Sequence, residues 1–378
     1  MEKVLEFAGS VPEFRRTGKG NIRHRLSDVI VLMILARTAG HAGRQEIIEF
    51  GRHNIAKFRA MGLLRRGVPS EPTLCRIEQG LDCAGLARGM AEMMASFRRE
   101  AAHAGGGPDI VCIDGKAMRG TVQGNGRNPD IVSAYSARLG ITLDTEMCRE
   151  KSNEMTAVPE LLGRLDIAGS IVTADAMSMQ KAIIDKIRER HGDFVIEVKA
   201  NQRALRYGIE DRLKTQKPTH VHEDGPALAH GRIESRSYRA YDGLPLIADR
   251  EKWGGRLTVA VFDSVTVRKS TGVRTAERRL YLSSLPPDAA LLGQAVRRHW
   301  AIESMHWNLD RNFKQDRIKR KTARAARNLD TIQRVVHALF AMWRMRRKKR
   351  SDKAKGNAEL MRDVSMSFTH LVRFLSQK

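Results

Sequence analysis

The segment "SIVTADAMSMQKAIIDKIRERHGDFVIEVKANQ", residues 170–202, indicates the fold class of this chain. Its two ends, 170–176 and 193–202, are short, rich in β-branched residues and bounded by small or polar residues, as is typical of strands. Between them, residues 178–192 have a helical pattern that closes at Gly192. A strand, a helix and a second strand form the unit from which α/β proteins are built, so we expect an α/β core.

Strand-like segments continue on both sides of this unit. Upstream, 109–115 and 131–143 read as strands, and a Gly-rich break at 101–109 separates them from the preceding residues. Downstream, residues 205–285 hold several strand-like segments without intervening helices, which predicts a β-rich block. The pattern is helical from 291 to 345, and the strongly basic residues after it predict a linker or tail.

Residues 1–100 are predicted to be mostly helical. One helix would start after Ser27, contain the apolar run at 29–36 and end near Gly40. Several short helices with basic residues near their entry would suit a helix-turn-helix-like reader of DNA, and a plain helical bundle has the same pattern. The basic residues concerned are Arg15, Arg16, Lys19, Arg23 and Arg25.

The charge of the chain predicts a polyanionic partner. The 378 residues include 67 Lys and Arg against 43 Asp and Glu, a formal net charge of +24. Such an excess favours binding to nucleic acid, because basic side chains release the counterions condensed on phosphates. A composition with 42% hydrophobic and 29% charged residues excludes wholesale disorder, and the length is sufficient for two or three domains.

The cysteines and the apolar segments predict a cytoplasmic protein without a membrane partner. The four cysteines form no Cys-x-x-Cys pair, so we expect reduced, packed thiols. The longest apolar run, "VIVLMILA" at 29–36, is much shorter than the roughly 20 residues that span a bilayer. The first ten residues also lack the long apolar core of a signal peptide.

Two acids lie where strands of the predicted core end. Asp114 in "VCIDGKAMRG" and Asp175 in "IVTADAMSMQ" each follow an apolar run. Open α/β sheets bind ligands just outside their strand ends. A third acid, Glu303, lies in "RRHWAIESMHWNLD" at 297–310, in a strongly basic part of the chain.

The segment around Glu303 has more than one interpretation. A helical period places Glu303 on one face with His299, with His306 or Trp307, and with Asp310. The helix alone is compatible with an ordinary core helix whose charged side faces solvent. It is also compatible with a zinc site, although the order of its acid and histidines differs from the His-Glu-x-x-His pattern.

Together, the three acids suggest a site for divalent metal ions. Two aspartates on strands and a glutamate on a helix can hold two ions about 3.5–4 Å apart, one at the attacking oxygen and one at the leaving oxygen. Oxygen ligands suit Mg²⁺ or Mn²⁺ rather than zinc. Basic side chains around the acids would bind the DNA phosphates and offset the negative charge of the carboxylates.

At this point the sequence resembles a known family, the DDE insertion-sequence transposases of the H-repeat-associated (ISAs-type) group. The similarity covers nearly the entire chain, because the N-terminal block through "PSEPTLCRIEQGLD" also resembles that group's associated domain. The strings that carry it occur in the family's order: "DGKAMRG", "KSNEMTAVPELL", "TADAMSMQKAI", "DFVIEVKANQ", "HGRIESRSY", "LYLSSL" and "HWAIESMHWNLD".

The resemblance implies an α/β fold with a ribonuclease H-like catalytic core, a β-rich insertion and an all-α N-terminal domain. The boundaries that we expect are a DNA-binding domain at 1–100, the first part of the core at 106–204, the insertion at 205–285, the glutamate helix part of the core at 286–345 and a basic tail at 346–378.

The resemblance also implies roles for individual residues. Asp114, Asp175 and Glu303 would be the catalytic residues and would bind two Mg²⁺ or Mn²⁺ ions. The residues expected to contact DNA are Lys116, Arg119, Lys199, Asn201, Gln202, Arg298, His299, Trp300 and His306.

This chain departs from the wider family around its glutamate. There a Tyr, an Arg and a Lys lie seven and four residues before and seven after the glutamate, whereas this chain has Val296, His299 and Asp310. Asp310 would assist the metal site or hold one of the two histidines. The basic neighbours that would supply the positive charge instead are Arg297, Arg298, Arg311 and Lys314.

The function implied is that of a DNA transposase, which binds the ends of its mobile element, cleaves DNA and transfers the strand. Its partners would be double-stranded DNA, both terminal repeats and target, and a second copy of itself in the DNA complex. We expect it in the cytoplasm at the nucleoid. Two alternatives remain: a decayed or domesticated relative that binds DNA without transposition, and a ribonuclease H-like nuclease without strand transfer.

Overall fold

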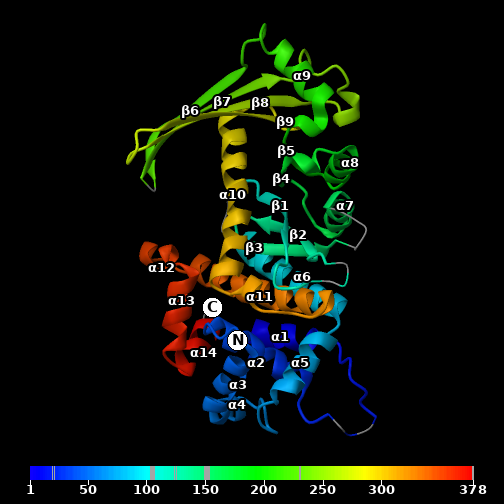
Figure 1. The fold of residues 1–378 in the computed structure, drawn as a ribbon, viewed down its shortest axis with the longest axis vertical. Helices are drawn as coiled ribbons and strands as arrows, with labels where there is room; N and C mark the ends of the chain where they lie inside the picture. Colours follow the sequence, from blue (N-terminus) through cyan, green and yellow to red (C-terminus); the bar gives the residue numbers. More distant parts are fainter. Residues whose placement is uncertain are drawn as a thin grey trace.

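The computed structural model describes residues 1–18, 20, 22–102, 107–122, 124, 126–148, 154–229 and 231–376. Several features of the sequence analysis fall partly or wholly outside these ranges: Lys19, residues 103–106 of the Gly-rich break, the start of "KSNEMTAVPELL" at 151–153, the first residue of "HGRIESRSY" and the last two residues of the predicted tail. The molecule is elongated, with a large sheet in its upper and middle parts and a group of helices below it (Figure 1).

A mixed α/β architecture is built on one large sheet. Its nine strands lie in the order β3-β2-β1-β4-β5-β9-β8-β7-β6. Strands β1, β4 and β5 are mutually parallel, and the remaining neighbours are antiparallel. The bounds are β1 Ile110–Ala117, β2 Asp130–Ser136, β3 Ile141–Met147, β4 Ile171–Ala174, β5 Asp193–Glu197, β6 His220–Ala229, β7 Arg232–Asp242, β8 Thr258–Arg268 and β9 Arg274–Ser283.

The predicted strand at 131–143 is in fact a hairpin. Strands β2 and β3 pair in antiparallel fashion and are joined by a turn at 137–140. Gly140 in that turn has a φ of 70°, a left-handed conformation that glycine adopts without steric cost. The apolar residues on both sides of the turn hid it in the sequence.

The β-rich block extends the core sheet rather than forming a sheet of its own. Strand β9 pairs with β5 over Val195–Glu197, so β6 to β9 continue the sheet beyond its parallel strands. The block also contains the helix α9, Arg203–Arg212, where the sequence analysis expected only strands. In Figure 1 the long strands β6 to β8 form the curved upper part of the molecule.

Helices fill the first hundred residues and the end of the chain. Among the helices of the described residues, none has the length and apolar character needed to cross a bilayer. Their bounds are α1 Glu2–Ser10, α2 Leu26–Thr38, α3 Arg44–His53, α4 Ile55–Ala60, α5 Glu71–Gly80, α6 Cys83–Ala102, α7 Glu154–Arg164, α8 Lys181–Glu189, α10 Ala289–Arg311, α11 Ala323–Met345, α12 Arg350–Ala354, α13 Asn357–Ser365 and α14 Phe368–Ser376.

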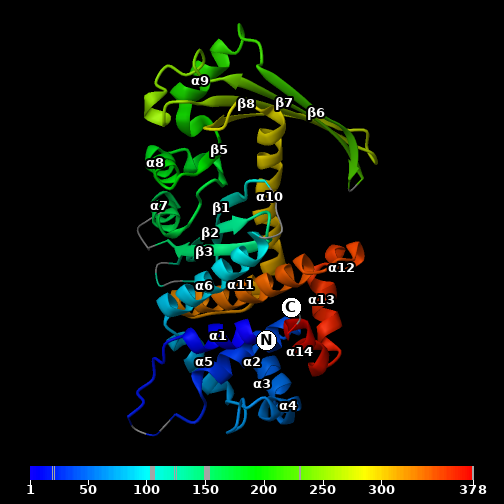
Figure 2. The same cartoon turned by 180° about the vertical axis from the view of Figure 1, so that it is seen from behind.

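Two long helices connect the parts of the molecule. Helix α10 crosses the sheet and contacts β1, β4, β5, β6, β7 and β8, while α11 lies between β3 and the N-terminal helices α2, α5 and α6 (Figure 1). Seen from behind, α6 and α11 lie side by side beneath the sheet (Figure 2). Helix α11 is buried along most of its length, so it acts as the core element that the sheet and the N-terminal helices share.

The basic tail predicted at 346–378 is wrong for most of its length, because the chain forms α12, α13 and α14 there. Leu360, Leu371 and Phe374 are buried. The ring of Phe368 lies 5.0 Å from that of Phe58, which belongs to the N-terminal helices. Apolar residues at helical spacing after the charged run therefore complete the core that the first helices begin.

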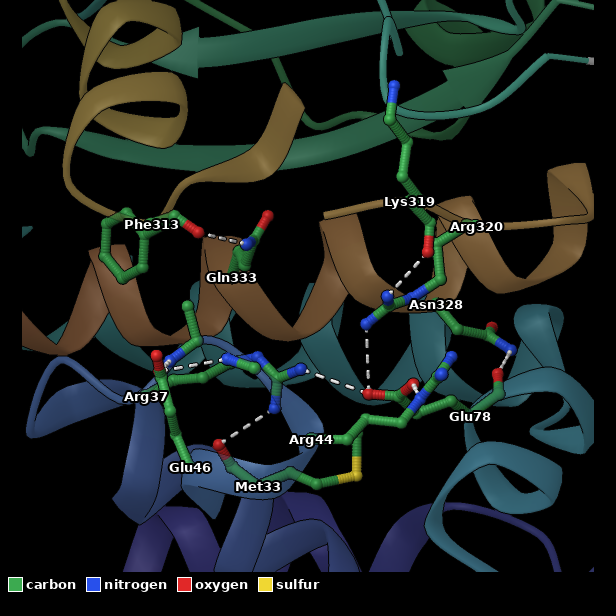
Figure 3. Close-up of polar contacts among 12 residues, drawn as sticks. Met33, Arg37, Arg44, Glu46, Glu78, Phe313, Lys319, Arg320, Asn328 and Gln333 are labelled. Carbon is green, nitrogen blue, oxygen red and sulfur yellow. Dashed lines mark hydrogen bonds and ion pairs between the residues drawn. The ribbon is translucent and has the colours of Figure 1, made fainter. Parts of the chain in front are cut away.

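A buried cluster of charged side chains joins the N-terminal helices to the segment before α11 (Figure 3). At its centre, the Glu78 carboxylate of α5 accepts from Arg37 of α2 at 3.2 Å, Arg44 of α3 at 2.7 Å and Arg320 at 3.2 Å. The Asn328 side-chain amide donates to the Glu78 backbone carbonyl at 2.9 Å. We call these five residues the Glu78 cluster.

The Glu78 cluster reaches the segment that follows Asp114. The backbone N–H of Arg320 donates to the carbonyl of Gly120 at 3.1 Å, and Arg320 forms an isolated β-bridge with Thr121. Glu78 is thus connected through Arg320 to Gly120 and Thr121, which follow the end of β1 at Ala117. The position of this segment depends on how the N-terminal helices pack.

Candidate active site

Asp114 and Asp175 occupy equivalent positions on neighbouring parallel strands. Ile113 of β1 lies opposite Ala174 of β4, and an aspartate follows each of them in the sequence. Asp114 lies within β1, whereas Asp175 directly follows the last residue of β4. Adjacent strands are about 4.7–4.9 Å apart, so the two carboxylates arise side by side at the same edge of the sheet. The two aspartates therefore lie close together, although only Asp175 lies at a strand end, because β1 continues beyond Asp114 to Ala117.

Three hydrogen bonds fix the turn after Asp175. The Asp175 carboxylate caps the short helix η1, Ala176–Ser178, by accepting from the backbone N–H of Ser178 at 3.3 Å. The side-chain amide of Asn201 donates to the carbonyl of Ala176 at 2.6 Å, and that of Gln202 donates to the carbonyl of Met179 at 2.8 Å. Asn201 and Gln202, which the sequence analysis placed on DNA, thus fix the loop that carries Asp175.

Helix α10 brings Glu303 to the first aspartate. Glu303 is exposed, and its pKa is raised, first by partial burial and then by the nearby charge of Asp114, while Arg279 opposes the rise. One turn along the same face, His306 places its Nδ1 atom 3.4 Å from Oδ2 of Asp114. The Nδ1 atom of His299 lies 3.0 Å from Oγ1 of Thr173, on β4.

Burial lowers the pKa of both histidines of this helix face. Burial lowers the pKa of His299, against the opposing charges of Asp114 and Asp175. Burial likewise lowers the pKa of His306, against its hydrogen bond with Asp114. Through one ring nitrogen each, at Thr173 and Asp114, the two histidines pack α10 against the sheet. Among the described residues, no group of three His, Cys, Asp or Glu is placed to hold a zinc ion.

A fourth acid, Glu154, lies beside the two aspartates. Burial and then the charges of Asp175, Asp114 and Asp130 raise its pKa to about 7. The sequence analysis quoted the string that contains Glu154 but assigned the acid no role. The available signal was an acid at the start of a helix paired with a glycine, Gly115, directly after the first aspartate.

The donor chemistry of this site fits a divalent cation. Asp114, Asp175, Glu303 and Glu154 supply carboxylate oxygens, the ligands that Mg²⁺ and Mn²⁺ prefer. No Lys or Arg in the described part of the chain forms an ion pair with any of them, so their charges repel one another. Within the described ranges, no three His, Cys, Asp or Glu side chains are close enough together to ligate one ion.

Lys116 does not reach solvent, contrary to its predicted contact with DNA phosphate. Its side chain is 8% exposed, and its Nζ atom lies 2.8 Å from Oδ1 of Asp310 and 3.3 Å from Oδ1 of Asp316. The same ion pair shows what Asp310 contacts. This acid pairs with Lys116 rather than with a histidine. The ion pairs join the end of α10 to β1.

The other cations and the tryptophan predicted to contact DNA lie on the surface. Arg119, Lys199 and Arg298 are exposed, and Lys199 pairs with Glu197 at 3.0 Å. Trp300 is 49% exposed, with the guanidinium of Arg279 5.6 Å from its ring centre. These residues are available to a large ligand, unlike Lys116.

The family of the chain agrees with this geometry. The family described as "Transposase DDE domain" matches residues 105–339, and the one described as "DDE_Tnp_1-associated" matches residues 5–94. The chain belongs to the DDE transposase family.

Its relatives carry names of the same kind. YncI of Escherichia coli O157:H7, provisionally named a transposase, is 31% identical over 346 residues, which are 89% of this chain and 86% of YncI. YhhI of E. coli K12, provisionally named an H repeat-associated transposase, is 31% identical over 89% of each chain. A protein from Xanthobacter autotrophicus, encoded in the dhlA 3′ region, is 30% identical over 74% of this chain and 93% of its own length.

Among the solved structures with a similar fold is a synaptic complex of piggyBac transposase with hairpin DNA, determined by cryo-electron microscopy. Its TM-score is 0.50 and its sequence identity is 10%. The alignment covers 99% of this chain and 81% of the piggyBac chain. At this level of identity the similarity concerns the fold alone.

Proposed function

We propose that this protein is a DNA transposase that binds the ends of its own mobile element, cleaves them and joins them to target DNA. The observation that carries this proposal is the position of Asp114 and Asp175 in register on the neighbouring parallel strands β1 and β4, with α10 bringing Glu303 to Asp114. Membership of the DDE transposase family supports it. In this proposal the three acids are the catalytic residues and the metal ligands.

The fold would divide accordingly. Residues 1–100 would form an all-α domain that binds DNA, β1 to β5 with α10 and α11 a ribonuclease H-like core, and β6 to β9 an insertion within it. The Glu78 cluster would then connect the DNA-binding domain to the segment after Asp114. The insertion would support the start of α10, where Arg297 pairs with Asp224 of β6 at 2.8 Å.

Two Mg²⁺ or Mn²⁺ ions, bound by Asp114, Asp175 and Glu303, would supply an activated oxygen nucleophile and stabilise the leaving oxygen. In the first reaction a water oxygen bonds to phosphorus, the bond from phosphorus to the 3′ oxygen breaks, and that oxygen takes a proton. In the second, the new 3′ hydroxyl attacks a target phosphate and displaces the target's 3′ oxygen. His306 orients Asp114 in both reactions, and Asn201 with Gln202 fixes the loop of Asp175.

Exposed cations would bind the phosphates around this site. Arg119 follows β1, Lys199 follows β5 and Arg298 lies on α10 one turn before Glu303. Trp300 would contact the DNA next to the cleaved bond, because its exposed ring is on the same helix. The net charge of +24 supports binding to terminal repeats and to target DNA, which would place the protein at the nucleoid.

Two ends of one element must be cut and joined in concert, so a homodimer would form on DNA. The test is incubation of the full-length protein with Mg²⁺ and a linear DNA that carries both ends of its element, together with a target plasmid. We expect cleavage at the element ends and joined products. Asp114→Asn, Asp175→Asn and Glu303→Gln should abolish both, whereas Asp185→Asn, on the exposed surface of α8, should not.

The other two functions give different products in this assay. Cleavage at wild-type rates by Asp114→Asn or Glu303→Gln would refute the assignment of the site. End binding without cleavage would indicate a decayed or domesticated relative. Cleavage without joined products would indicate a ribonuclease H-like nuclease.

A further inference from the structure

The carboxylate of Glu154 lies directly over the backbone of β1, next to Asp114. A Cβ atom placed on Gly115 would lie 1.8 Å from Oε1 of Glu154 and 2.5 Å from its Cδ. Gly115 is not among the glycines with positive φ, so space for this carboxylate, rather than backbone conformation, is what requires a glycine here. The sequence that follows the first aspartate is therefore adapted to the side chain of Glu154.

The helix that carries Glu154 also faces the second aspartate. Glu154 is the first residue of α7, and α7 packs against β2, β3 and η1, the turn that Asp175 caps. The charges of both Asp175 and Asp114 act on the Glu154 carboxylate. Glu154 is thus close enough to Asp114 and Asp175 for their charges to act on it. It approaches them from α7, whereas Glu303 approaches from α10.

This environment differs from that of a structural acid in the same region. Asp144, on β3, is buried and pairs with Arg164, at the other end of α7, at 2.9 Å. Glu154 has no such partner, since no Lys or Arg of the described residues forms an ion pair with it. A half-buried carboxylate surrounded by like charges is unfavourable in the protein alone, and a bound cation offsets that cost.

We propose that Glu154 is a fourth carboxylate of the active site, which binds a divalent cation together with Asp114 and Asp175. This inference rests on the proposed function, because it assigns the cation to the same two aspartates. Gly115 leaves the space in which the Glu154 carboxylate lies, and the cation draws together acids that repel one another in its absence. The charge that offsets the carboxylates is then the metal itself.

The test uses Mn²⁺ alone as the probe, with full-length protein and no DNA, so it does not depend on catalysis. Binding is measured by electron paramagnetic resonance of free Mn²⁺, for the wild type, Glu154→Gln, Asp114→Asn and the control Glu160→Gln, which is exposed on the same helix. We expect Glu154→Gln to bind Mn²⁺ about 10-fold or more weakly, since even the loss of an outer-shell partner has an effect of this size. Glu160→Gln should bind as the wild type does.

Thermal unfolding supplies a second readout. Without metal, Glu154→Gln should have a Tm equal to or higher than that of the wild type, because it removes one of several repelling charges. With Mn²⁺, its Tm should rise less than that of the wild type, because a ligand that binds the folded state stabilises it in proportion to its affinity. An acid with a purely structural role would instead lower the metal-free Tm when replaced.

Gly115→Ala tests the same contact without removing a charge. Its added Cβ meets the flexible end of Glu154, so the chain should fold while the carboxylate moves away from β1. We expect weaker Mn²⁺ binding, and no further loss when Gly115→Ala is combined with Glu154→Gln, since both changes remove one interaction. Additive losses would count against a shared role.

The outcomes separate this inference from the proposed function. If Asp114→Asn loses Mn²⁺ binding and Glu154→Gln keeps the wild-type affinity, the inference is wrong and the proposed site stands. If the wild type fails to bind Mn²⁺, or Asp114→Asn binds as the wild type does, both are wrong.

Discussion

The Nδ1 atom of His306 lies 3.4 Å from the Oδ2 atom of Asp114, and this contact ties α10 to the strand that carries the first acid. Glu303 lies three residues earlier on the same helix, so the histidine sets the distance between two of the proposed catalytic residues. Because the imidazole is largely buried and its pKa is lowered by that burial, it acts as a neutral donor to the carboxylate.

Replacing His306 should therefore slow cleavage without unfolding the protein. We expect His306→Ala to reduce the single-turnover cleavage rate about 10-fold to 100-fold, the usual effect of losing a group that orients a metal ligand. His306→Asn, whose side-chain nitrogen can occupy the position of Nδ1, should recover part of the rate. Circular dichroism checks the fold, and equal rates for His306→Ala and the wild type would show that the contact has no positioning role.

The surroundings of Lys116 and Arg119 predict different responses of DNA binding to salt. Arg119 is exposed after β1, whereas the ammonium of Lys116 is already paired with Asp310 and Asp316. The slope of log affinity against log salt concentration should fall by about 1 in Arg119→Met. Lys116→Met should keep the wild-type slope. Fluorescence anisotropy with labelled element ends over a KCl series measures both, and a reduced slope for Lys116→Met would place Lys116 on DNA after all.

The Glu78 cluster should contribute strongly to stability once it has formed. Glu78→Ala leaves Arg37 and Arg320 buried without their carboxylate, and breaking a buried pair from one side costs about 3–5 kcal/mol of unfolding free energy. Urea unfolding followed by circular dichroism gives this value. The exposed acid Glu49 of α3 provides a control, since Glu49→Ala should change stability by less than about 0.5 kcal/mol. Similar values for the two variants would contradict a buried, fully engaged Glu78.

His337 predicts how the stability depends on pH. It is buried in α11, and burial, together with the positive charges of Arg344 and Arg334, lowers its pKa from 6.5 to about 3. Between these values the unfolded chain binds a proton that the folded chain does not. The unfolding free energy should therefore fall as the pH falls through this window, by up to about 1.4 kcal/mol per pH unit from this group.

Urea unfolding at several pH values between 4 and 6 measures that dependence. His337→Phe keeps an aromatic ring between Tyr135 and Phe313, whose ring centres are each 6.4 Å from that of His337. In this variant the slope of the unfolding free energy against pH should be smaller by the contribution of one proton, up to about 1.4 kcal/mol per pH unit. His370→Phe, on the exposed side of α14, should retain the wild-type slope, and an unchanged slope in His337→Phe would refute the assignment.

The sequence predicted the parallel strands well and placed both aspartates directly after an apolar run, because both features depend on local patterns, but it did not predict that β1 continues past Asp114 to Ala117. The runs around Asp114 and Asp175 are continuous and β-branched, as in strands buried on both faces, and the acids mark where each run ends. The helical face of Glu303 followed from spacing alone. None of these predictions required knowledge of a contact between distant residues.

The parts that the sequence missed depend on such contacts. Lys116 pairs with Asp310, almost two hundred residues later, and nothing in the local pattern distinguishes it from an exposed lysine. Glu154 gains its significance only when α7 places it over Gly115. The charged run that begins at Arg346 was likewise a stronger local signal than the apolar spacing around Phe368, so the end of the chain was interpreted as a tail.

The packing of Phe368 against Phe58 imposes an order on synthesis. The helices α2 and α4 leave the ribosome early, yet α13 and α14, which pack against them, are made only after the central sheet. A nascent or prematurely terminated chain therefore has an incomplete N-terminal core, however well its central sheet has formed. Since the Glu78 cluster connects those helices to the segment after Asp114, we expect cleavage competence to arise only after α14 has been translated.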